Sequence, residues 1–194
     1  GEQQLRAETI VIATGSCPRI PDIPGLAESG YLTPETLMEM EVVPERLIIL
    51  GGGNIAVEFA QMFRRFGAQV TILQQGDQLL EREDDDVAQC LQDIFHDEGI
   101  HVLLNCQVTN IVRDTKVLSI MARTKNGMQS IKGTHLLLAA GQTPNTKMLH
   151  PEKAGIQTDE EFHIRVNDSL ETNVSGIYAM GDVKGGPAFT HIAY

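Results

Sequence analysis

A glycine-rich turn between an apolar strand and a helix is the feature that most constrains how this chain can fold. Residues 46–50 are apolar, which predicts a buried strand, and Gly51-Gly-Gly-Asn-Ile-Ala56 follows directly. Residues 54–66 place apolar side chains at helical spacing, Gly67 is a typical helix stop, and residues 69–73 predict a second strand. The order strand, glycine turn, helix, strand predicts a βαβ unit with a parallel sheet.

The glycines of this turn match the pattern G-x-G-x-x-G/A of dinucleotide-binding proteins. Gly51 permits the tight turn, Gly53 lets the backbone approach a pyrophosphate, and Ala56 lets the helix pack closely on the strand. Free amide groups and the positive end of the helix dipole attract phosphate at the start of the helix. We expect an NAD(P) site formed by Gly51, Gly53, Asn54 and Ile55. A glycine turn without a ligand is the alternative, which the strand–turn–helix–strand context disfavours.

The residue that contacts the adenosine ribose is expected at the end of the second strand, about 20 residues after the first glycine. That position is Gln74. An acidic residue there would accept hydrogen bonds from the ribose 2′-hydroxyl and repel a 2′-phosphate, whereas glutamine repels little. The first arginine after this strand is Arg82, so no arginine directly follows Gln74 to bind a 2′-phosphate. The choice between NAD and NADP stays open at this point.

The alternation of strands and helices continues, so the fold class is α/β and Rossmann-like. Residues 85–98 predict a second helix and residues 100–104 a third parallel strand. An antiparallel β-meander follows, with Asn126-Gly127 as a hairpin turn, and the apolar residues 134–139 predict a strand that returns to the parallel sheet. The apolar stripes expected on the two helices are Ile55, Phe59, Met62, Phe63 and Phe66, and Val87, Leu91, Ile94 and Phe95.

The first 45 residues predict a strand, a connector and a short helix. Residues 8–15 are apolar and β-branched and end in Gly15, which predicts a buried strand. Several prolines in residues 18–24 exclude a helix or a central strand. Thr33-Pro34-Glu35 is typical of a helix start. The sequence begins without Met and enters a strand almost at once, so we expect an internal segment of a longer protein.

Composition narrows the function classes. The formal net charge of −11 and the lack of a basic cluster argue against nucleic acid as a partner. No apolar run approaches the ~20 residues of a membrane helix. Cys17, Cys90 and Cys106 are widely spaced, so we expect structural thiols and a cytoplasmic protein. The acids of residues 81–86 precede a helix, where they complement its dipole, and we expect no metal site.

Four motifs follow one another along the chain: Ile12-Ala-Thr-Gly15, Gly51-Gly-Gly-Asn-Ile-Ala-Val-Glu58, Ala140-Gly-Gln-Thr-Pro-Asn-Thr146 and Ile177-Tyr-Ala-Met-Gly-Asp-Val183. In these motifs and their order the chain resembles the pyridine nucleotide-disulfide oxidoreductases, the family of glutathione reductase, dihydrolipoamide dehydrogenase and mercuric reductase. The resemblance covers nearly the whole chain. Residues 181–193 are also similar to a mercuric-reductase-like subgroup that includes reductases of reactive chlorine species. His191, in this tail, is expected to act through its backbone.

The resemblance implies that an NAD(P)-binding domain at residues 23–144 is inserted into an FAD-binding domain formed by residues 1–22 and 145–194. It implies FAD contacts by Thr14, Gly15, Gly181 and Asp182. It also implies that Gly141 lies at the NAD(P) site and that Glu58 pairs with a lysine beside the flavin. Two residues depart from the family pattern. Asn54 stands where an aromatic gate is common, and Gln142 replaces the usual arginine.

The activity implied by this resemblance is transfer of a hydride from NAD(P)H to FAD, and from there to a disulfide or a small oxidant. Cys17 has no second cysteine five residues away, so it is not half of the family's redox-active pair. A homodimer is expected through a domain that is absent from this sequence, and the segment alone is expected to bind NAD(P) with little turnover. The alternative is a dinucleotide-binding sensor or regulatory module without a redox step.

Overall fold

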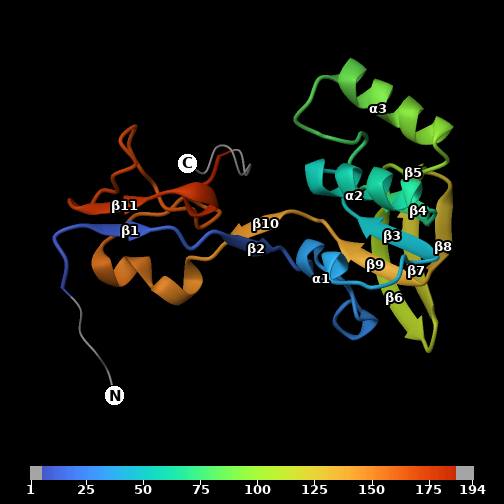
Figure 1. Cartoon of the computed structure of the whole chain (residues 1–194), viewed down its shortest axis with the longest axis horizontal. Helices are drawn as coiled ribbons and strands as arrows, with labels where there is room; N and C mark the ends of the chain where they lie inside the picture. The colour runs from blue at the N-terminus through green and yellow to red at the C-terminus, as the bar shows by residue number, and fades with distance from the viewer. Residues whose placement is uncertain (1–5, 187–194) are drawn as a thin grey trace. The chain divides into compact units, whose positions relative to one another are not determined.

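The computed structural model describes residues 6–186 of the chain, which divide into two compact units (Figure 1). The central unit is the continuous segment Pro18–Gly141, and the discontinuous unit combines Gly1–Cys17 with Gln142–Tyr194. The domain boundaries inferred from the sequence, after residues 22 and 144, lie a few residues further along the chain. Which cofactor each unit binds stays a prediction.

A four-stranded parallel sheet organises the central unit, as the sequence predicts. In sheet order its strands are β5 (His101–Leu103), β4 (Gln69–Leu73), β3 (Arg46–Leu50) and β9 (His135–Leu138). Two helices connect the strands, α2 (Asn54–Arg65) between β3 and β4 and α3 (Asp85–Asp97) between β4 and β5. The order matches one half of a doubly wound dinucleotide-binding sheet, with the glycine turn on a central strand.

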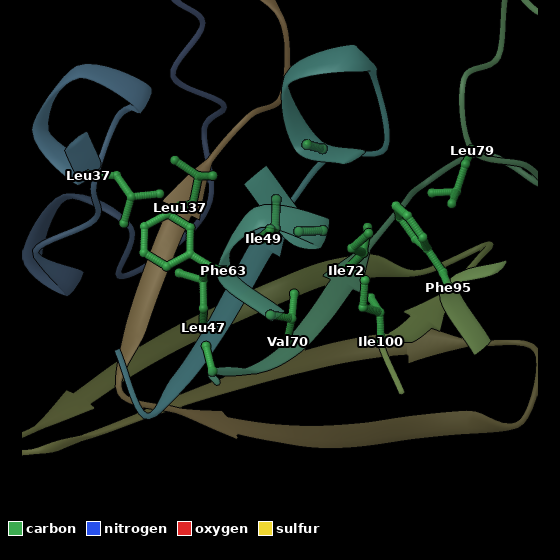
Figure 2. Close-up of a cluster of buried hydrophobic side chains, with 13 residues drawn as sticks. Leu37, Leu47, Ile49, Phe63, Val70, Ile72, Leu79, Phe95, Ile100 and Leu137 are labelled. Atoms are coloured by element: carbon green, nitrogen blue, oxygen red, sulfur yellow. The ribbon is translucent and has the colours of Figure 1, made fainter. Parts of the chain in front are cut away.

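Both faces of this sheet are covered, which explains the uninterrupted apolar strands. Leu47 and Ile49 belong to a core cluster with Phe63 of α2 and Phe95 of α3, and Figure 2 shows these side chains above the sheet. Ile48 and its neighbours on the opposite face pack against the antiparallel meander. The sheet is therefore the middle layer of three, between helices and meander.

The meander consists of β6 (Gln107–Asp114), β7 (Val117–Thr124) and β8 (Gly127–Gly133), paired in that order. Its β7–β8 turn differs in register from the one predicted. Thr124 pairs with Gly127, so the two loop residues are Lys125 and Asn126, while Gly127 begins β8 with a φ of 98°. The left-handed glycine follows the loop instead of lying within it, a common alternative in hairpins.

The helices bury a narrower stripe than the apolar spacing predicts. On α2 the buried residues are Ala56, Ala60 and Phe63, and on α3 they are Ala88 and Phe95. Three residues predicted to face the core are instead exposed: Phe66 by 60%, Val87 by 48% and Ile94 by 43%. No helix within residues 6–186 has the length and apolar character needed to cross a bilayer.

Glu98 joins the C-terminal ends of α2 and α3. Its Oε1 accepts hydrogen bonds of 2.9 Å from Arg65 and from Gln61, and its main-chain oxygen accepts one of 2.7 Å from Arg64. The hydrogen bond from Arg65, with those from Gln61 and the nearby positive charges, holds the pKa of Glu98 below its ordinary value against the opposing effect of desolvation. The carboxylate form therefore supports the packing of the two helices.

The connector of residues 18–45 contains η1 (Ala27–Ser29) and α1 (Pro34–Met38). The predicted helix start is confirmed. The hydroxyl of Thr33 accepts a hydrogen bond from the backbone N–H of Thr36, and the hydroxyl of Thr36 accepts one from the backbone N–H of Thr33. This reciprocal capping satisfies two amide groups that the helix itself leaves free. Leu32 forms a parallel bridge with Leu137, which attaches the connector to β9.

The discontinuous unit is built mainly from short elements. Its pairs are β1 (Ile10–Ile12) with β11 (Ile177–Ala179), in parallel, and β2 (Ser16–Pro18) with β10 (Gln142–Pro144), and its turns include η2 (Lys147–Leu149), η3 (Pro151–Ala154) and η4 (Gly181–Lys184). The prediction of a buried first strand is wrong for Ile10 and Val11, which are 47% and 52% exposed. Within the described residues β1 pairs on one side only. Of its three residues only Ile12 packs against the small hydrophobic core of this unit, which contains Ile164 and Val183.

The three cysteines are unpaired but differ in environment. Cys106 is buried between the sheet and the meander, and burial raises the pKa of its thiol, which fits the predicted structural thiol. Cys17 and Cys90 are exposed, so the prediction that they pack as structural thiols is wrong for these two.

Candidate functional site

The first glycine of the turn is fixed by its backbone. Gly51 has a φ of 117°, and its N–H donates to the carbonyl of Leu73 at 2.9 Å. A Cβ atom on Gly51 would lie 2.2 Å from the carbonyl oxygen of Ala139. Only glycine fits at this junction of β3, β4 and β9, which confirms the structural reason predicted for Gly51.

Gly53 shows the opposite situation. It is the N-cap of α2 with an extended backbone, and a Cβ atom there would meet nothing within 4 Å. The first turn of α2 has neither a side-chain cap nor an acidic residue, so the N–H groups at its start have no side-chain acceptor among residues 6–186. Asn54 is exposed and Ile55 half-buried in this turn, while Ala56 is fully buried against the sheet. Open space next to free amide groups at a helix start is the geometry that a pyrophosphate requires.

Gln74 lies directly after β4, where the sequence places it, but it does not act alone. Its side chain is only 8% exposed and lies against Gly52, whose Cβ position would be 2.8 Å from the amide carbon of Gln74. Its Nε2 donates to Oε1 of Glu81 at 2.9 Å. Glu81 is a residue of this region that sequence reasoning assigned only to the helix dipole. The spacing of seven residues across a loop carries no pattern that predicts this contact.

Glu58 and Gly141 are also accessible. Glu58 is exposed on α2 and forms no salt bridge or side-chain hydrogen bond with another residue of the described range 6–186. Gly141 is exposed with a φ of 99°, and its carbonyl accepts a hydrogen bond from the N–H of Arg19 at 2.9 Å. The roles predicted for both residues, pairing with a lysine and contact with NAD(P), stay predictions.

In the discontinuous unit the motif of residues 12–15 is tied to that of residues 140–146. The Oγ1 of Thr14 donates to the carbonyl of Asn145 at 3.1 Å, and Nδ2 of Asn145 donates to the carbonyl of Thr14 at 2.9 Å. The N–H of Asn145 also donates to the carbonyl of Gly15 at 2.9 Å. Gly15 has a φ of 65°, and a Cβ atom on it would meet nothing within 4 Å. These bonds fix a turn with open space on its glycine.

Asp182 lies in η4, the turn that follows β11, and Ser16 contacts its carboxylate. The hydroxyl of Ser16 donates to Oδ2 of Asp182 at 2.8 Å and also lies within hydrogen-bond distance of Oε1 of Gln142. Gly181, the residue before Asp182, has a φ of 71°. Ser16, Gln142 and Asp182 thus form one polar group, in which Gln142 and Asp182 come from two of the sequence motifs and Ser16 directly follows a third. Sequence reasoning missed Ser16, although it directly follows the Ala-Thr-Gly motif. His191 lies outside the described residues.

The described part of the discontinuous unit also contains a shallow hollow of about 340 Å³. It is lined by Thr146, Lys147, Pro151, Glu152, Ile156, Thr158 and Phe162. None of the residues predicted to bind a cofactor lines it, so the hollow is not the predicted site.

The fold, the glycine turn and the four motifs define a class, and comparison with known families agrees with them. The family model for pyridine nucleotide-disulphide oxidoreductases matches residues 1–194, so the chain belongs to this family. The family consists of enzymes, flavoproteins that use FAD and NAD(P)H. This finding confirms the family and the α/β Rossmann-like fold class that the sequence predicts.

Individual members of the family show which of its enzymes the chain resembles. The chain is 33% identical to a mercuric reductase of Staphylococcus aureus over 191 residues, which are 98% of this chain and 35% of that protein. It is 38% identical to RclA of Escherichia coli K12, a probable pyridine nucleotide-disulfide oxidoreductase, over 100% of this chain and 43% of that protein. A solved structure of the E. coli protein, an HOCl-induced flavoprotein disulfide reductase, matches 97% of this chain and 43% of its own with a TM-score of 0.88. The chain spans less than half the length of these relatives.

Proposed function

We propose that the whole protein passes a hydride from NAD(P)H to FAD, and from there passes electrons to a disulfide or a small oxidant. In this proposal the central unit binds NAD(P) and the discontinuous unit contributes to the FAD site. The observation that carries it is the open start of α2 at Gly53, two residues after Gly51, where only glycine fits. When bound, the nicotinamide and flavin rings supply the redox chemistry, and the residues of the chain bind and orient them.

The proposed NAD(P) contacts follow from the geometry of the turn. The free N–H groups at Asn54 and Ile55 would donate to the pyrophosphate oxygens, and the dipole of α2 would add favourable charge. Gly53 leaves room for the phosphates to approach the backbone. Gly141 would lie at the same site, with no side chain to fill the space beside it.

The proposed FAD contacts belong to the discontinuous unit. Asp182 would accept a hydrogen bond from a ribityl hydroxyl with the carboxylate oxygen that Ser16 leaves free, because Ser16 orients the other. The turn of Thr14 and Gly15, with Gly181 before Asp182, would let the flavin approach the backbone. Glu58 would accept a hydrogen bond from a lysine of the flavin domain that lies outside this sequence.

The terminal acceptor and the assembly are also proposals. Relatives named as mercuric reductases support a metal ion as a small acceptor, and a relative described as a flavoprotein disulfide reductase supports a disulfide. A homodimer would form through a domain beyond this sequence. Three unpaired cysteines support a cytoplasmic location.

A Gly53→Ala variant tests the NAD(P) site without disturbing the fold. A Cβ at Gly53 meets nothing, so we expect the free energy of unfolding to change by no more than about 1 kcal/mol. The added methyl group would occupy the space of a phosphate oxygen, so calorimetry should show at least about tenfold weaker binding of NAD⁺ or NADP⁺.

The matched control is Gly67→Ala, at the other end of the same helix. Gly67 has a φ of 100° and open space around it, so the substitution should lower stability by about 1 kcal/mol and leave binding unchanged. Binding by Gly53→Ala equal to that of the unmodified protein would contradict the proposed cradle. Tight coenzyme binding without flavin reduction in the full-length protein would instead support a sensor.

A further inference from the structure

The loop between β4 and α3, residues 75–84, is hydrogen-bonded to the glycine turn. The N–H of Leu80 donates to the carbonyl of Gly52 at 2.8 Å. Leu79 is fully buried and lies beside Phe95 in the core above the sheet (Figure 2). On the other side, the N–H of Asn105 donates to the carbonyl of Gly76 at 2.7 Å. These contacts attach the loop to the core and to the glycine turn, next to the proposed coenzyme site.

In this conformation the carboxylate of Glu81 lies at the end of β4. The Oε1 of Glu81 lies so close to Gly76 that a Cβ atom on this glycine would be 1.9 Å from it. The same oxygen accepts the hydrogen bond from Gln74, whose buried side chain lies against Gly52. One oxygen of Glu81 is thus fixed by Gln74, and its second carboxylate oxygen forms no hydrogen bond with the described residues.

A carboxylate at this point of a dinucleotide-binding fold has a defined chemical consequence. The residue at the end of the second strand of the βαβ unit contacts the adenosine ribose, and a carboxylate there accepts hydrogen bonds from the ribose hydroxyls and repels a 2′-phosphate. Residues 75–86 add five further acids and one arginine, Arg82, so the surrounding charge is also unfavourable to a second phosphate.

We propose that Glu81, oriented by Gln74, is the specificity-determining residue of the coenzyme site and selects NAD(H) over NADP(H). The inference rests on the proposed function, since it presupposes that the glycine turn binds a dinucleotide. Glu81 supplies the negative charge that the strand-end position itself lacks. Gln74 acts through Glu81 and is a positioning residue.

The test compares ADP-ribose with 2′-phospho-ADP-ribose, which probe the adenosine half of the site and need no redox reaction. Calorimetry on the full chain should show at least about tenfold tighter binding of ADP-ribose. Glu81→Gln keeps the size of the side chain and removes its charge. This variant should lower the ratio of the two affinities by about tenfold, because it weakens ADP-ribose and relieves the repulsion of the phosphate.

Glu83→Gln is the matched control. It removes the same charge from the same loop. The side chain of Gln78 donates a hydrogen bond to the main-chain oxygen of Glu83, and the substitution keeps this bond. Its ratio should stay within about threefold of the unmodified protein, because an exposed charge that does not touch the ligand is screened by salt. An effect of Glu83→Gln equal to that of Glu81→Gln would overturn the proposal in favour of a general charge effect.

Gln74→Met tests the positioning role, because methionine keeps much of the volume and removes the amide. It should lower the affinity ratio in the unmodified background and have little further effect in the Glu81→Gln background, which a double-mutant cycle measures. An affinity ratio near one in the unmodified chain, with both ligands bound, would overturn the inference and leave the proposed function intact. Failure of both ligands to bind would overturn the proposed function itself.

Discussion

The two units of this protein are stabilised in different ways. Among residues 6–186, the central unit buries two clusters of 13 and 11 hydrophobic residues on opposite faces of one sheet. The discontinuous unit buries a single cluster of four, Ile156, Ile164, Ala179 and Val183. The central unit therefore depends mainly on apolar burial, whereas the discontinuous unit depends more on its local hydrogen bonds.

Those local bonds are visible in its turns. The Oδ1 of Asp159 accepts from the backbone N–H groups of Glu161 and His163, and the Oδ1 of Asn167 accepts from those of Ser169 and Glu171. Side chains of this type replace the backbone partners that a regular helix or sheet would supply. The comparison teaches that a small unit with few buried side chains can be ordered by polar turns.

The largest expected effect concerns the core of the central unit. Phe95→Ala should lower the free energy of unfolding by about 3–5 kcal/mol, because Phe95 is 1% exposed between α3 and the sheet. Val183→Ala, in the small core of the discontinuous unit, removes about two methylene equivalents and should cost only about 1.5 kcal/mol. Urea unfolding measures both, and hydrogen exchange of peptides shows which unit opens. Equal losses would break the contrast between the two cores.

An intermediate effect is expected at the glycine turn. Gly51→Ala combines a left-handed backbone with a Cβ only 2.2 Å from the carbonyl of Ala139, so it should cost about 2–4 kcal/mol. Gly127→Ala is the matched control, because Gly127 has a φ of 98° in open space and should lose only about 1 kcal/mol. Thermal unfolding separates the two contributions, and similar losses would show that the overlap is relieved by movement.

The smallest effect is expected at the pairing of α2 with α3. Glu98 has its pKa lowered in the folded protein, mainly by the hydrogen bond from Arg65, so its contribution to stability is present above the unfolded-state pKa and lost as the pH falls through the folded-state value. Glu98→Gln should therefore lower the unfolding temperature slightly at pH 7, and this difference should disappear once the pH is below the folded-state pKa. A difference that persists in acid would point to lost packing instead of lost charge.

The regular parts of the fold were predictable because they follow from short-range pattern. The strands at Arg46–Leu50 and Gln69–Leu73 match the predicted bounds, and the glycine turn between β3 and α2 does so too. The covered arc of each helix was not predictable, since periodicity identifies an apolar stripe but not what lies opposite it. Phe66 and Ile94 have the spacing of the stripe but are exposed, and Phe66 already lies beyond the last residue of α2.

The contacts within the candidate site were less predictable than its backbone. The position of Gln74 followed from the spacing of strand and turn, but its partner Glu81 arrives through an irregular loop that no periodicity describes. The bond between Ser16 and Asp182 joins residues 166 positions apart in the chain. Contacts of this kind depend on the whole topology. A local sequence pattern can therefore identify one residue of such a pair but not the residue that it contacts.

The parallel pairing of β1 with β11 also has a consequence for biosynthesis. Ile10 leaves the ribosome long before Ile177, its partner, and the entire central unit is made in between. The central unit is continuous and contains its own sheet, so we expect it to form first and to shorten the effective loop that separates the two strands. Strand β1 can pair with β11 only after that interval, so Ile10 and Val11 lack their strand partners until residues 177–179 have been made.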